Sequence, residues 1–406
     1  IQKLIKKSSI YAGHDISSGG MIVSLLEMCF PSKKIGMKIN LDSLDNNDIV
    51  SVLFSENSGL IVQSNENIEL IFKKLNIEFH LIGTANRSGY LEIKKDDFNL
   101  SLNIDQYRDI WFKTSYEFDK FQTKNNLAEK RFDNYKKNSL QFLFPKKFNG
   151  SMPSKKTNKI KAAVIREKGS NSEREMAYAM HLSGFEVHDV HMTDLISGRT
   201  NLEDFHFLVA VGGFSNSDVL GSAKGWAGAF LYNKKARKSL EDFFKRKNTL
   251  SLGVCNGCQL FIELGLITPD DSELPKMMIN DSGKFECVFT SVKIEKSSSI
   301  MLRGMEGSVL GIWAAHGEGK FHLPLKEKKY QIPAKYYYRS YPSNPNGSDY
   351  NSAMLCSQNG RHLVMMPHLE RSTFPWNWAH YPKDRQDKVS PWVMAFENAF
   401  SWLSKR

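Results

Sequence analysis

The second half of the chain alternates short apolar runs with amphipathic segments, and this alternation restricts the fold more than any other feature. Lys161–Glu167 and Thr249–Val254 are apolar or β-branched runs of strand length, whereas Lys234–Lys247 has helical spacing. Strands that alternate with helices form right-handed βαβ units, which build a mainly parallel sheet covered by helices. We therefore predict an α/β fold with an open, mostly parallel sheet flanked by helices.

The first part of the chain has a different pattern. Gly19–Phe30 and Asn67–Leu75 have the apolar spacing of helices, and Gly59–Ser64 and Gly89–Lys95 have the composition of strands. Helices and strands do not alternate regularly here. We predict that this part is the end of an α+β domain.

A stretch rich in Lys, Asn and Ser (Lys124–Lys161) separates the two patterns, and we interpret it as a solvated linker. The predicted domains are residues 1–110 (the α+β part), 111–158 (the linker) and 159–406 (the α/β domain). The formal charge of +11 comes partly from the linker. Its aromatic residues are not arranged as a stacking platform, so we expect no nucleic-acid partner.

Five cysteines, an odd number scattered along 406 residues, argue against a disulfide framework. They indicate a reducing compartment, and we expect a cytoplasmic protein. No apolar run approaches the roughly 20 residues of a membrane span, so no membrane partner is expected. The chain opens at Ile1 in a pattern typical of mid-domain sequence, and we expect it to be part of a longer protein.

Cys255 lies where an apolar run gives way to a helical pattern. Gly253–Gln259 reads Gly-x-Cys-x-Gly-x-Gln, which is typical of a nucleophile on a sharp strand-to-helix turn. The N-terminus of a helix favours a thiolate and offers free amides to an oxyanion. Three alternatives remain open: a zinc site, which needs about four ligands, a redox pair with Cys258, and two small buried residues at a turn.

A thiol nucleophile needs a base, and the base needs a group that orients it. His368 follows an apolar run near the end of the chain, and Glu370 comes two residues later. Residues two apart in an extended segment face the same side. We predict that Glu370 holds one imidazole nitrogen of His368 while the other nitrogen faces Cys255.

A second glycine turn, within Val209–Gly228, also follows a strand-like run. The backbone amides of Gly213 and Phe214, together with the amide of Asn256, are candidates for an oxyanion hole. A purely structural glycine turn is the alternative.

Several longer motifs carry a family resemblance. They are REKGSNSEREMA, DVHMTDLISGRTNLEDFHFLVAVGGFSNSDVLG, LGVCNGCQL, HGEGKF, YPSNPNGS and MMPHLER, with HDISSGG and LFSENSGLIVQ in the first part of the chain. With these motifs the chain resembles the carboxy-terminal portion of the phosphoribosylformylglycinamidine synthase family, large single-chain type. The resemblance implies a class I glutamine amidotransferase domain of flavodoxin-like fold. It also implies that the preceding α+β part is the end of a synthetase-like domain related to aminoimidazole ribonucleotide synthetase.

The resemblance implies a carbon–nitrogen ligase of de novo purine biosynthesis that uses glutamine as its amido-nitrogen donor. Cys255, His368 and Glu370 would form the triad that hydrolyses L-glutamine. The ammonia would serve the ATP-dependent conversion of formylglycinamide ribonucleotide to formylglycinamidine ribonucleotide. The remainder of the synthase polypeptide, which binds most of the ATP, is then an expected partner.

The same resemblance assigns two residues of HDISSGG. Asp15 resembles a magnesium ligand, and Ser17 resembles a residue that contacts ATP. A hard carboxylate suits Mg²⁺, and a hydroxyl suits a phosphate or nucleotide edge. An exposed Asp15 that caps the following helix is the alternative. His316 also belongs to a family motif, and we expect it to shape a loop or to dock the synthetase domain.

The chain departs from the family pattern at two places. Asn216 and Ser217 replace the Tyr-Gly pair of the usual Gly-Gly-Phe-Ser-Tyr-Gly-Asp, and Leu369 replaces the usual Pro between the triad His and Glu. Neither change removes a catalytic atom. Two other functions remain open: a class I amidotransferase that serves another acceptor, and a non-catalytic docking subunit.

Overall fold

The computed structural model describes residues 1–32, 34–64, 68–137, 140–154, 160–268 and 272–405. The chain divides into two compact units, Ile1–Phe118 and Asp119–Arg406. Each unit has its own hydrophobic core. The units are therefore treated as separate bodies, unit 1 and unit 2.

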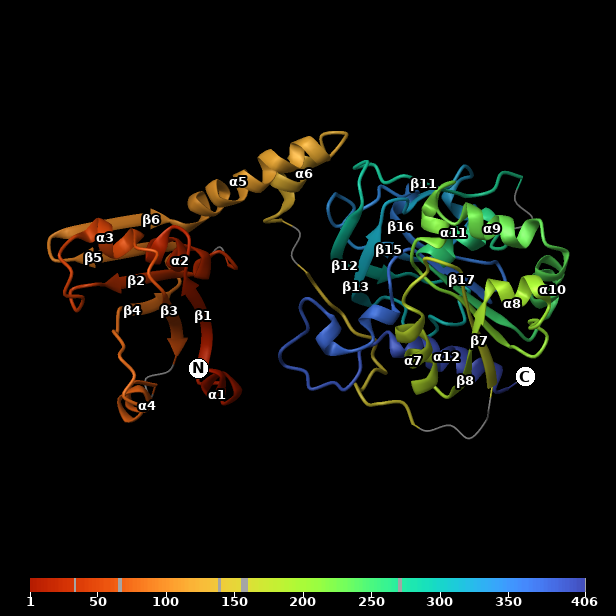
Figure 1. The fold of residues 1–406 in the computed structure, drawn as a ribbon, viewed down its shortest axis with the longest axis horizontal. Coiled ribbons are helices and arrows are strands. Elements are labelled where there is room, and N and C mark those ends of the chain that lie inside the picture. Colours follow the sequence, from red (N-terminus) through yellow and green to blue (C-terminus); the bar gives the residue numbers. More distant parts are fainter. Residues whose placement is uncertain (33, 65–67, 138–139, 155–159, 269–271, 406) are drawn as a thin grey trace. The chain divides into compact units, whose positions relative to one another are not determined.

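Unit 1 is an α+β fold, as predicted for this part of the chain. Its elements are α1 (Gln2–Lys6), β1 (Ile10–Ile16), α2 (Gly20–Cys29), β2 (Gly36–Asn40), α3 (Ile49–Phe54), β3 (Gly59–Ser64), α4 (Ile68–Lys74), β4 (Gly83–Asn86), β5 (Tyr90–Lys95), β6 (Phe98–Asn103) and α5 (Ile104–Gln122), whose end passes into unit 2 (Figure 1). Within the described residues, β1 pairs with β3, and a second sheet has the order β4-β2-β5-β6. Leu25 of α2 packs in one core with Ile39 and Leu91 of that sheet.

Unit 2 is built around one large sheet. Its strands are β7 (Ile160–Arg166), β8 (Phe185–His191), β9 (Phe207–Ala210), β10 (Leu250–Val254), β12 (Glu286–Ile294), β13 (Val309–His316), β15 (Gln331–Tyr336), β16 (Ser352–Cys356) and β17 (His362–Met365) (Figure 1). In the described part of the unit these nine strands have the order β13-β12-β15-β16-β17-β10-β9-β7-β8. A short ribbon of β11 (Lys276–Met278) and β14 (Lys320–His322) lies outside this sheet.

The sheet is mixed. Strands β17, β10, β9, β7 and β8 pair in parallel, whereas β16, β15, β12 and β13 continue the sheet through antiparallel pairs. The predicted α/β class is confirmed, with a larger antiparallel part than we expected. Parallel neighbours need a crossover, usually a helix, and the described residues between β12 and β17 contain strands and 3₁₀ turns but no α-helix. Without such a helix, the strands from β12 to β17 pair in the antiparallel direction.

Helices cover the parallel part of the sheet. They are α7 (Glu173–Leu182), α8 (Met192–Ser197), α9 (Lys224–Leu231), α10 (Lys234–Lys245), α11 (Asn256–Glu263) and α12 (Val393–Leu403). The chain moves outward from β7 to β8 and then inward through β9 to β10, so right-handed crossovers place α7 on one face and α8–α10 on the other. Among the helices that the structure describes, none is long and apolar enough to cross a membrane.

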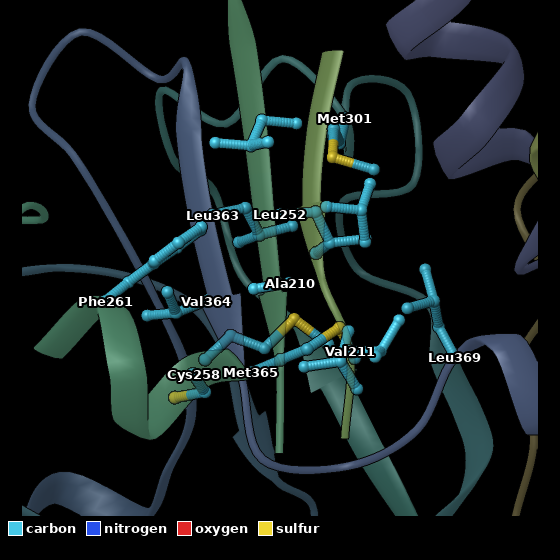
Figure 2. Packing of buried hydrophobic residues seen from close by; sticks show 14 of the residues in the cluster. Ala210, Val211, Leu252, Cys258, Phe261, Met301, Leu363, Val364, Met365 and Leu369 are labelled. Atoms are coloured by element: carbon cyan, nitrogen blue, oxygen red, sulfur yellow. The ribbon is translucent and has the colours of Figure 1, made fainter. Parts of the chain in front are cut away.

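The core beneath the carboxyl ends of the central strands is densely apolar. Leu252 of β10 packs beside Leu363 of β17 and Ala210, and Phe261 and Cys258 of α11 close the cluster (Figure 2). Burial of a Leu or Phe side chain contributes about 1.5–3 kcal/mol. The apolar character of β9, β10 and β17 thus fixes the ends of these three strands beside one another.

The segment between the two predicted domains is not a free linker. The Lys124 amide donates to the Ser282 carbonyl at 2.8 Å, and Leu143 forms an antiparallel bridge with Val309 of β13. The ring of Phe142 packs edge-on against Trp378 at a centroid distance of 5.0 Å. The predicted boundary at 158–159 lies outside the described residues, and the predicted domain limits stay predictions.

A buried cluster of charges fixes the second helix of this segment, α6 (Leu127–Asn134). Arg131 contacts Asp119 at 3.2 Å and Glu286 at 3.1 Å, and the Tyr341 hydroxyl donates to Glu286 at 2.8 Å. Burial opposes ionisation of Asp119, but hydrogen bonds from Lys284 and Thr123 and the charge of Arg131 lower its pKa below the usual value. Arg131 is therefore a main counter-charge for two buried carboxylates.

We expect Arg131→Ala to lower the free energy of unfolding of unit 2 by about 1–3 kcal/mol, because it leaves Asp119 and Glu286 less well paired. Lys130→Ala, which removes an exposed cation from the same helix, is the control and should change stability by less than about 0.5 kcal/mol. Urea denaturation of both variants measures the difference. Equal stability of the two variants would show that the cluster contributes nothing.

Candidate active site

Cys255 occupies the turn between β10 and α11. Its backbone has φ 51° and ψ −107°, a conformation that L-residues rarely adopt. The Cys255 amide donates to the Met365 carbonyl at 2.8 Å, which holds the turn against the end of β17. The strained turn and the strand-to-helix context agree with the elbow that the sequence predicts.

The two glycines around Cys255 are required by close packing. A Cβ at Gly257 would lie 2.0 Å from the Ala210 carbonyl oxygen, and a Cβ at Gly253 would lie 2.6 Å from the Gly257 carbonyl oxygen. Only hydrogen at these positions lets α11 begin directly against β9 and β10. This packing sets the position of Cys255 directly after the carboxyl end of the central strand β10.

His368 and Glu370 form a buried pair next to the elbow. The Nδ1 atom of His368 lies 2.6 Å from Glu370 Oε1, and the two side chains are 2% and 0% exposed. The His368 amide donates to the Trp313 carbonyl at 2.7 Å, which ties the segment to β13. A Cβ at Gly212 would lie 2.8 Å from His368 Cε1 and 3.3 Å from Cys255 Cβ. The structure thus brings the imidazole and the cysteine together against one glycine.

Charges at this site support each other. Burial alone would lower the pKa of His368, but the negative charge of Glu370 and the neighbouring Cys255 sulfur, with hydrogen bonds to both, raise it to about 10. Burial opposes ionisation of Glu370, yet the positive His368 lowers the pKa of this carboxyl below its usual range. The imidazole therefore holds its proton at neutral pH and is paired with Glu370.

The replacement of Pro by Leu369 keeps the backbone that the pair needs. Leu369 has φ −68°, the value at which a proline ring fixes the backbone. Its side chain is fully buried in the main core of unit 2 (Figure 2). The buried leucine holds the turn by packing where proline would hold it by its ring.

The glycine turn supplies fewer free amides than the sequence predicts. The Phe214 amide already donates to the Gly169 carbonyl at 2.8 Å, which leaves it less available to an oxyanion, and its assignment to an oxyanion hole stays a prediction. An antiparallel bridge between Ser170 and Gly213 causes this pairing, and sequence spacing gives no sign of it. Within the described residues the amides of Gly213 and Asn256 have no partner, and these two remain candidates.

The Asn256 side chain links the two turns, a role that sequence reasoning missed. Its Oδ1 accepts from the Ser215 amide at 3.1 Å, and its Nδ2 donates to Gln259 Oε1 at 3.0 Å. Gln259 in turn donates to the Glu318 carbonyl at 2.8 Å. Both polar side chains are buried, so these bonds fix the elbow relative to the glycine turn and to the loop after β13.

The residues that depart from the family pattern adopt a strained conformation. Asn216, Ser217 and Asp218 all have positive φ, at 53°, 56° and 50°. Glycine adopts this region without cost, whereas other L-residues lose about 1–2 kcal/mol each. Ser217, in place of the usual glycine, therefore keeps the left-handed backbone at an energetic cost.

A small cavity of about 90 Å³ opens beside Cys255. It is lined by the glycine turn, the start of α11, the residue before β12, and the end of β13 with the loop that follows. The lining residues are Gly213, Phe214, Asp218, Ser222, Cys255, Gln259, Phe285, Ala315, His316, Gly317 and Glu318. The proposed nucleophile thus faces a partly open cavity of side-chain size.

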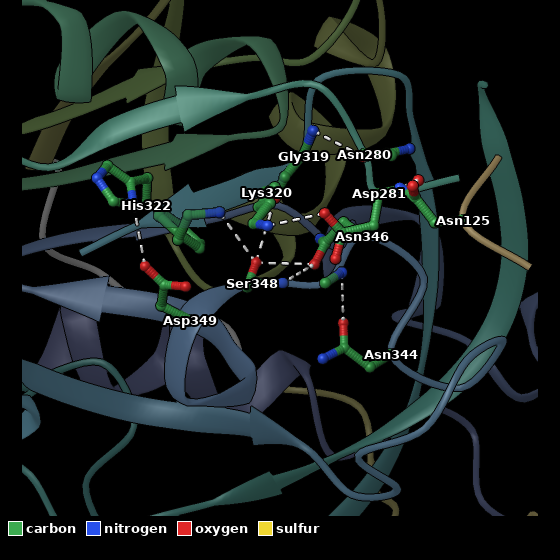
Figure 3. A network of polar contacts seen from close by, with 12 residues as sticks. Asn125, Asn280, Asp281, Gly319, Lys320, His322, Asn344, Asn346, Ser348 and Asp349 are labelled. Carbon is green, nitrogen blue, oxygen red and sulfur yellow. Dashed lines mark hydrogen bonds and ion pairs between the residues drawn. The ribbon is translucent and has the colours of Figure 1, made fainter. Parts of the chain in front are cut away.

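A network of buried amides shapes the loop after β13 (Figure 3). Asn280 donates to the His316 carbonyl at 2.7 Å and accepts from the Gly319 amide at 2.9 Å. Asn346 donates to the Tyr336 hydroxyl and lies 3.4 Å from His316 Nε2. Burial, and then the charge of His368, lower the pKa of His316 to about 3, so it is neutral. These contacts agree with a role in loop geometry.

Asp15 and Ser17 belong to unit 1. Both are exposed, Asp15 at the end of β1 and Ser17 in the turn before α2. Asp15 does not cap α2, whose N-cap is Gly19 without a side-chain bond. The described residues contain no group of three His, Cys, Asp or Glu that could hold a metal. One exposed carboxylate still fits Mg²⁺, which takes most of its ligands from phosphates and water.

We expect Ser217→Gly to raise the free energy of unfolding by about 0.5–1 kcal/mol, because relief of the left-handed strain exceeds the entropy that glycine adds to the unfolded chain. Ser197→Gly, within helix α8, is the control and should destabilise the protein. Denaturant unfolding of the two variants measures both changes. A destabilised Ser217→Gly variant would contradict the strain argument.

The His368–Glu370 pair predicts a pH dependence of stability. The pKa of His368 is raised from 6.5 to about 10, so its charge stabilises the fold fully below pH 6.5, and this stabilisation is lost as pH rises towards 10. In Glu370→Gln the loss over this interval should be smaller, because the partner charge is gone. Denaturant unfolding at several pH values measures the slopes. Glu186→Gln breaks the exposed pair with His188 (3.1 Å) and should keep the parent slope.

Comparisons with known proteins agree with this architecture. Residues 159–403 match the family model described as CobB/CobQ-like glutamine amidotransferase domain, and residues 1–96 match AIR synthase related protein, C-terminal domain. An Arabidopsis thaliana protein named probable phosphoribosylformylglycinamidine synthase, chloroplastic/mitochondrial, is 40% identical over 99% of this chain and 31% of its own length. Proteins named phosphoribosylformylglycinamidine synthase from Homo sapiens and Dictyostelium discoideum are 37% and 36% identical, over 33% and 34% of their lengths and 99% of this chain.

The chain therefore spans about a third of the length of the curated relatives it matches. The names of these relatives confirm the resemblance that the sequence motifs indicate. The first family model covers more than half of the chain, including the elbow, the glycine turn and the His368–Glu370 pair. The chain belongs to the CobB/CobQ-like glutamine amidotransferase family, and its first part matches the C-terminal domain of AIR synthase related proteins.

Proposed function

We propose that unit 2 hydrolyses L-glutamine, with Cys255 as nucleophile, His368 as acid and base, and Glu370 as the group that orients His368. The observation that carries the proposal is the buried His368–Glu370 pair, packed with Cys255 against Gly212. Membership of the glutamine amidotransferase family supports glutamine as the substrate. The raised pKa of His368 supports a resting imidazolium beside the cysteine sulfur.

The first half of the proposed reaction forms a thioester. The Cys255 sulfur attacks the γ-carboxamide carbon of glutamine, and the carbonyl π electrons move to oxygen. The amides of Gly213 and Asn256 donate to this oxyanion. The carbon–nitrogen bond then breaks, and the proton on His368 moves to the leaving nitrogen, so that ammonia departs.

The second half releases glutamate. His368, now neutral, takes a proton from water, and the hydroxide attacks the thioester carbon. The carbon–sulfur bond breaks, glutamate leaves, and the sulfur and imidazolium return to their starting state. Glu370 stays ionised and hydrogen-bonded to His368 Nδ1 in every step. The imidazole therefore keeps its orientation, and its positive charge stays paired whenever it is protonated.

We further propose that the ammonia serves a larger enzyme, a carbon–nitrogen ligase of purine biosynthesis. The relatives named phosphoribosylformylglycinamidine synthase support ATP-dependent conversion of formylglycinamide ribonucleotide to formylglycinamidine ribonucleotide. The remainder of such a polypeptide, formylglycinamide ribonucleotide and ATP are then the partners. Asp15 would hold Mg²⁺ and Ser17 would contact ATP, where the metal neutralises phosphate charge. The free cysteines support a reducing compartment, and we propose the cytoplasm.

We expect Cys255→Ala to lower the rate of glutamate release from glutamine about 10³-fold or more, because the proposed thioester can no longer form at position 255. Cys258→Ala is the control. Its thiol is fully buried, and burial raises its pKa well above the usual value, so it cannot act as a nucleophile. A coupled glutamate assay of the two variants tests the assignment. A Cys255→Ala variant as fast as the parent would refute it.

Covalent capture gives a second readout. A glutamine-mimicking electrophile should add once to the parent and to Cys258→Ala, and it should not add to Cys255→Ala. Intact mass spectrometry of the three proteins measures the addition. Equal labelling of all three would place the reactive group elsewhere.

A further inference from the structure

A second cavity of unit 2, of about 410 Å³, lies where the central strands of the large sheet begin. Lys247 precedes β10 and Arg361 directly precedes β17, whereas Cys255 follows the carboxyl end of β10. Among the described residues, this cavity and the one beside Cys255 share no lining residue. We call the second cavity the basic pocket. It is separated from the candidate active site by the length of the central strands.

Cations dominate the lining of the basic pocket. In the part of the chain that the structure describes, the lining includes Lys247, Arg303 and Arg361 but no Asp or Glu. Lys247 and Arg303 form no ion pair with any described residue. Like charges that gather around one cavity repel each other, and a bound anion removes this repulsion. The charge of the pocket therefore points to an anionic ligand.

The Arg361 guanidinium is held in place by the protein itself. Its Nη1 donates to the Arg246 carbonyl and to the Thr249 carbonyl, the latter at 3.2 Å. Thr249 is buried, and its hydroxyl donates to the same Arg246 carbonyl at 3.1 Å. A guanidinium fixed in this way loses little side-chain freedom when it binds a phosphate, whose oxygens match its planar set of donors.

The backbone around the other polar groups of the pocket is also fixed. Asn359 Oδ1 accepts from the Arg361 amide at 3.0 Å and from the Ser357 hydroxyl at 2.9 Å. Asn359 Nδ2 has no hydrogen bond among the described residues, and it adds a neutral donor to the lining. Asn398 of α12 donates to the Arg303 carbonyl at 2.8 Å. The pocket thus gathers donors on loops whose positions are set before a ligand binds.

One part of the lining is apolar. Trp402 of α12 and Ile300 line the pocket together with the cations, and Ile300 is buried. An indole ring next to Lys and Arg side chains is a combination that binds a nucleobase by stacking and its phosphate by charge. The volume of the pocket lies within the range of about 300–1,000 Å³ that is usual for small-molecule sites.

We propose that the basic pocket binds a mononucleotide, a ligand with a nucleobase, a ribose and one phosphate. Lys247, Arg303 and Arg361 bind the phosphate through charge-assisted hydrogen bonds, and the base packs against Trp402. This site is independent of the glutaminase function proposed above, because it shares no described lining residue with the cavity at Cys255.

The first test measures the contribution of the phosphate. Titration calorimetry of the full chain with adenosine 5′-monophosphate, at about 0.15 M salt, should show saturable binding. Lys247→Gln/Arg303→Gln removes two exposed cations of the lining and should weaken this binding at least about 10-fold. Adenosine, which lacks the phosphate, should bind the parent at least about 10-fold more weakly than the nucleotide does.

A matched control separates a contact from net charge. Lys234→Gln/Lys276→Gln removes two exposed cations that do not line the pocket, and it should bind the nucleotide with parental affinity. Parental affinity in Lys247→Gln/Arg303→Gln would mean that the nucleotide binds elsewhere on the chain, and it would overturn the proposal. An equal loss in both double variants would overturn it as well, because the effect would then come from net charge alone.

The second test concerns the base. Trp402→Leu keeps an apolar side chain but removes the indole ring, so it should weaken binding of adenosine 5′-monophosphate about 10-fold. Ribose 5-phosphate has no base, and its affinity should stay at the parental value in the same variant. An equal loss for both ligands, or a loss for neither, would overturn the assignment of the base to Trp402.

Glutamate release separates this proposal from the glutaminase. Without nucleotide, Lys247→Gln/Arg303→Gln should release glutamate from glutamine at the parental rate, because the cavity at Cys255 is unchanged. If the parent binds the nucleotide through these cations but never releases glutamate, the glutaminase proposal fails and the basic pocket stands. If turnover is intact and no variant of the pocket alters nucleotide binding, the basic pocket alone is wrong.

Discussion

The site depends on the close approach of a glycine backbone to the imidazole of His368 and to Cys255. Gly212 leaves room for only a hydrogen between the main chain, His368 Cε1 and Cys255 Cβ. This packing excludes water from the imidazole, and a buried imidazolium is tolerated only because Glu370 lies 2.6 Å from it. Removal of water also strengthens each electrostatic contact. Gly212 thus keeps water from the imidazole, and Glu370 supplies the negative charge that the buried imidazolium then needs.

Both halves of the mixed sheet contribute to this constraint. The parallel half brings the ends of β9, β10 and β17 to one edge, where the glycine turn, the elbow and His368 follow them. The antiparallel half supplies β13, whose Trp313 carbonyl accepts from the His368 amide and whose following loop closes the cavity. A purely parallel sheet would place Cys255 and the His368–Glu370 pair but would leave the cavity without its second wall.

Sequence reasoning found what local pattern determines and missed what distant pairing determines. The elbow at Cys255 could be predicted because a strand, two glycines and a helix start are adjacent in the chain. The hydrogen bond from the Phe214 amide to the Gly169 carbonyl could not be predicted, because it joins two loops that are far apart in the sequence. Likewise, the docking of Leu143 on Val309 has no signal within a Lys-rich stretch. The antiparallel half of the sheet could not be predicted either, because the lengths of its connections are known only when the ends of the strands are known.

The run from Asn216 to Asp218 shows how a strained turn is held by the residues around it. Three consecutive left-handed residues cost several times the strain of one, yet the amides of Phe214 and Asn216 are fixed by carbonyls of the facing loop. Because hydrogen bonds from the facing loop fix this backbone, position 217 can adopt the left-handed region without glycine. Glycine would only lower the free-energy cost of that conformation. The cost falls on stability, while Asp218 lines the cavity. The hydrogen bonds from the facing loop can therefore hold Ser217 in the left-handed region without glycine.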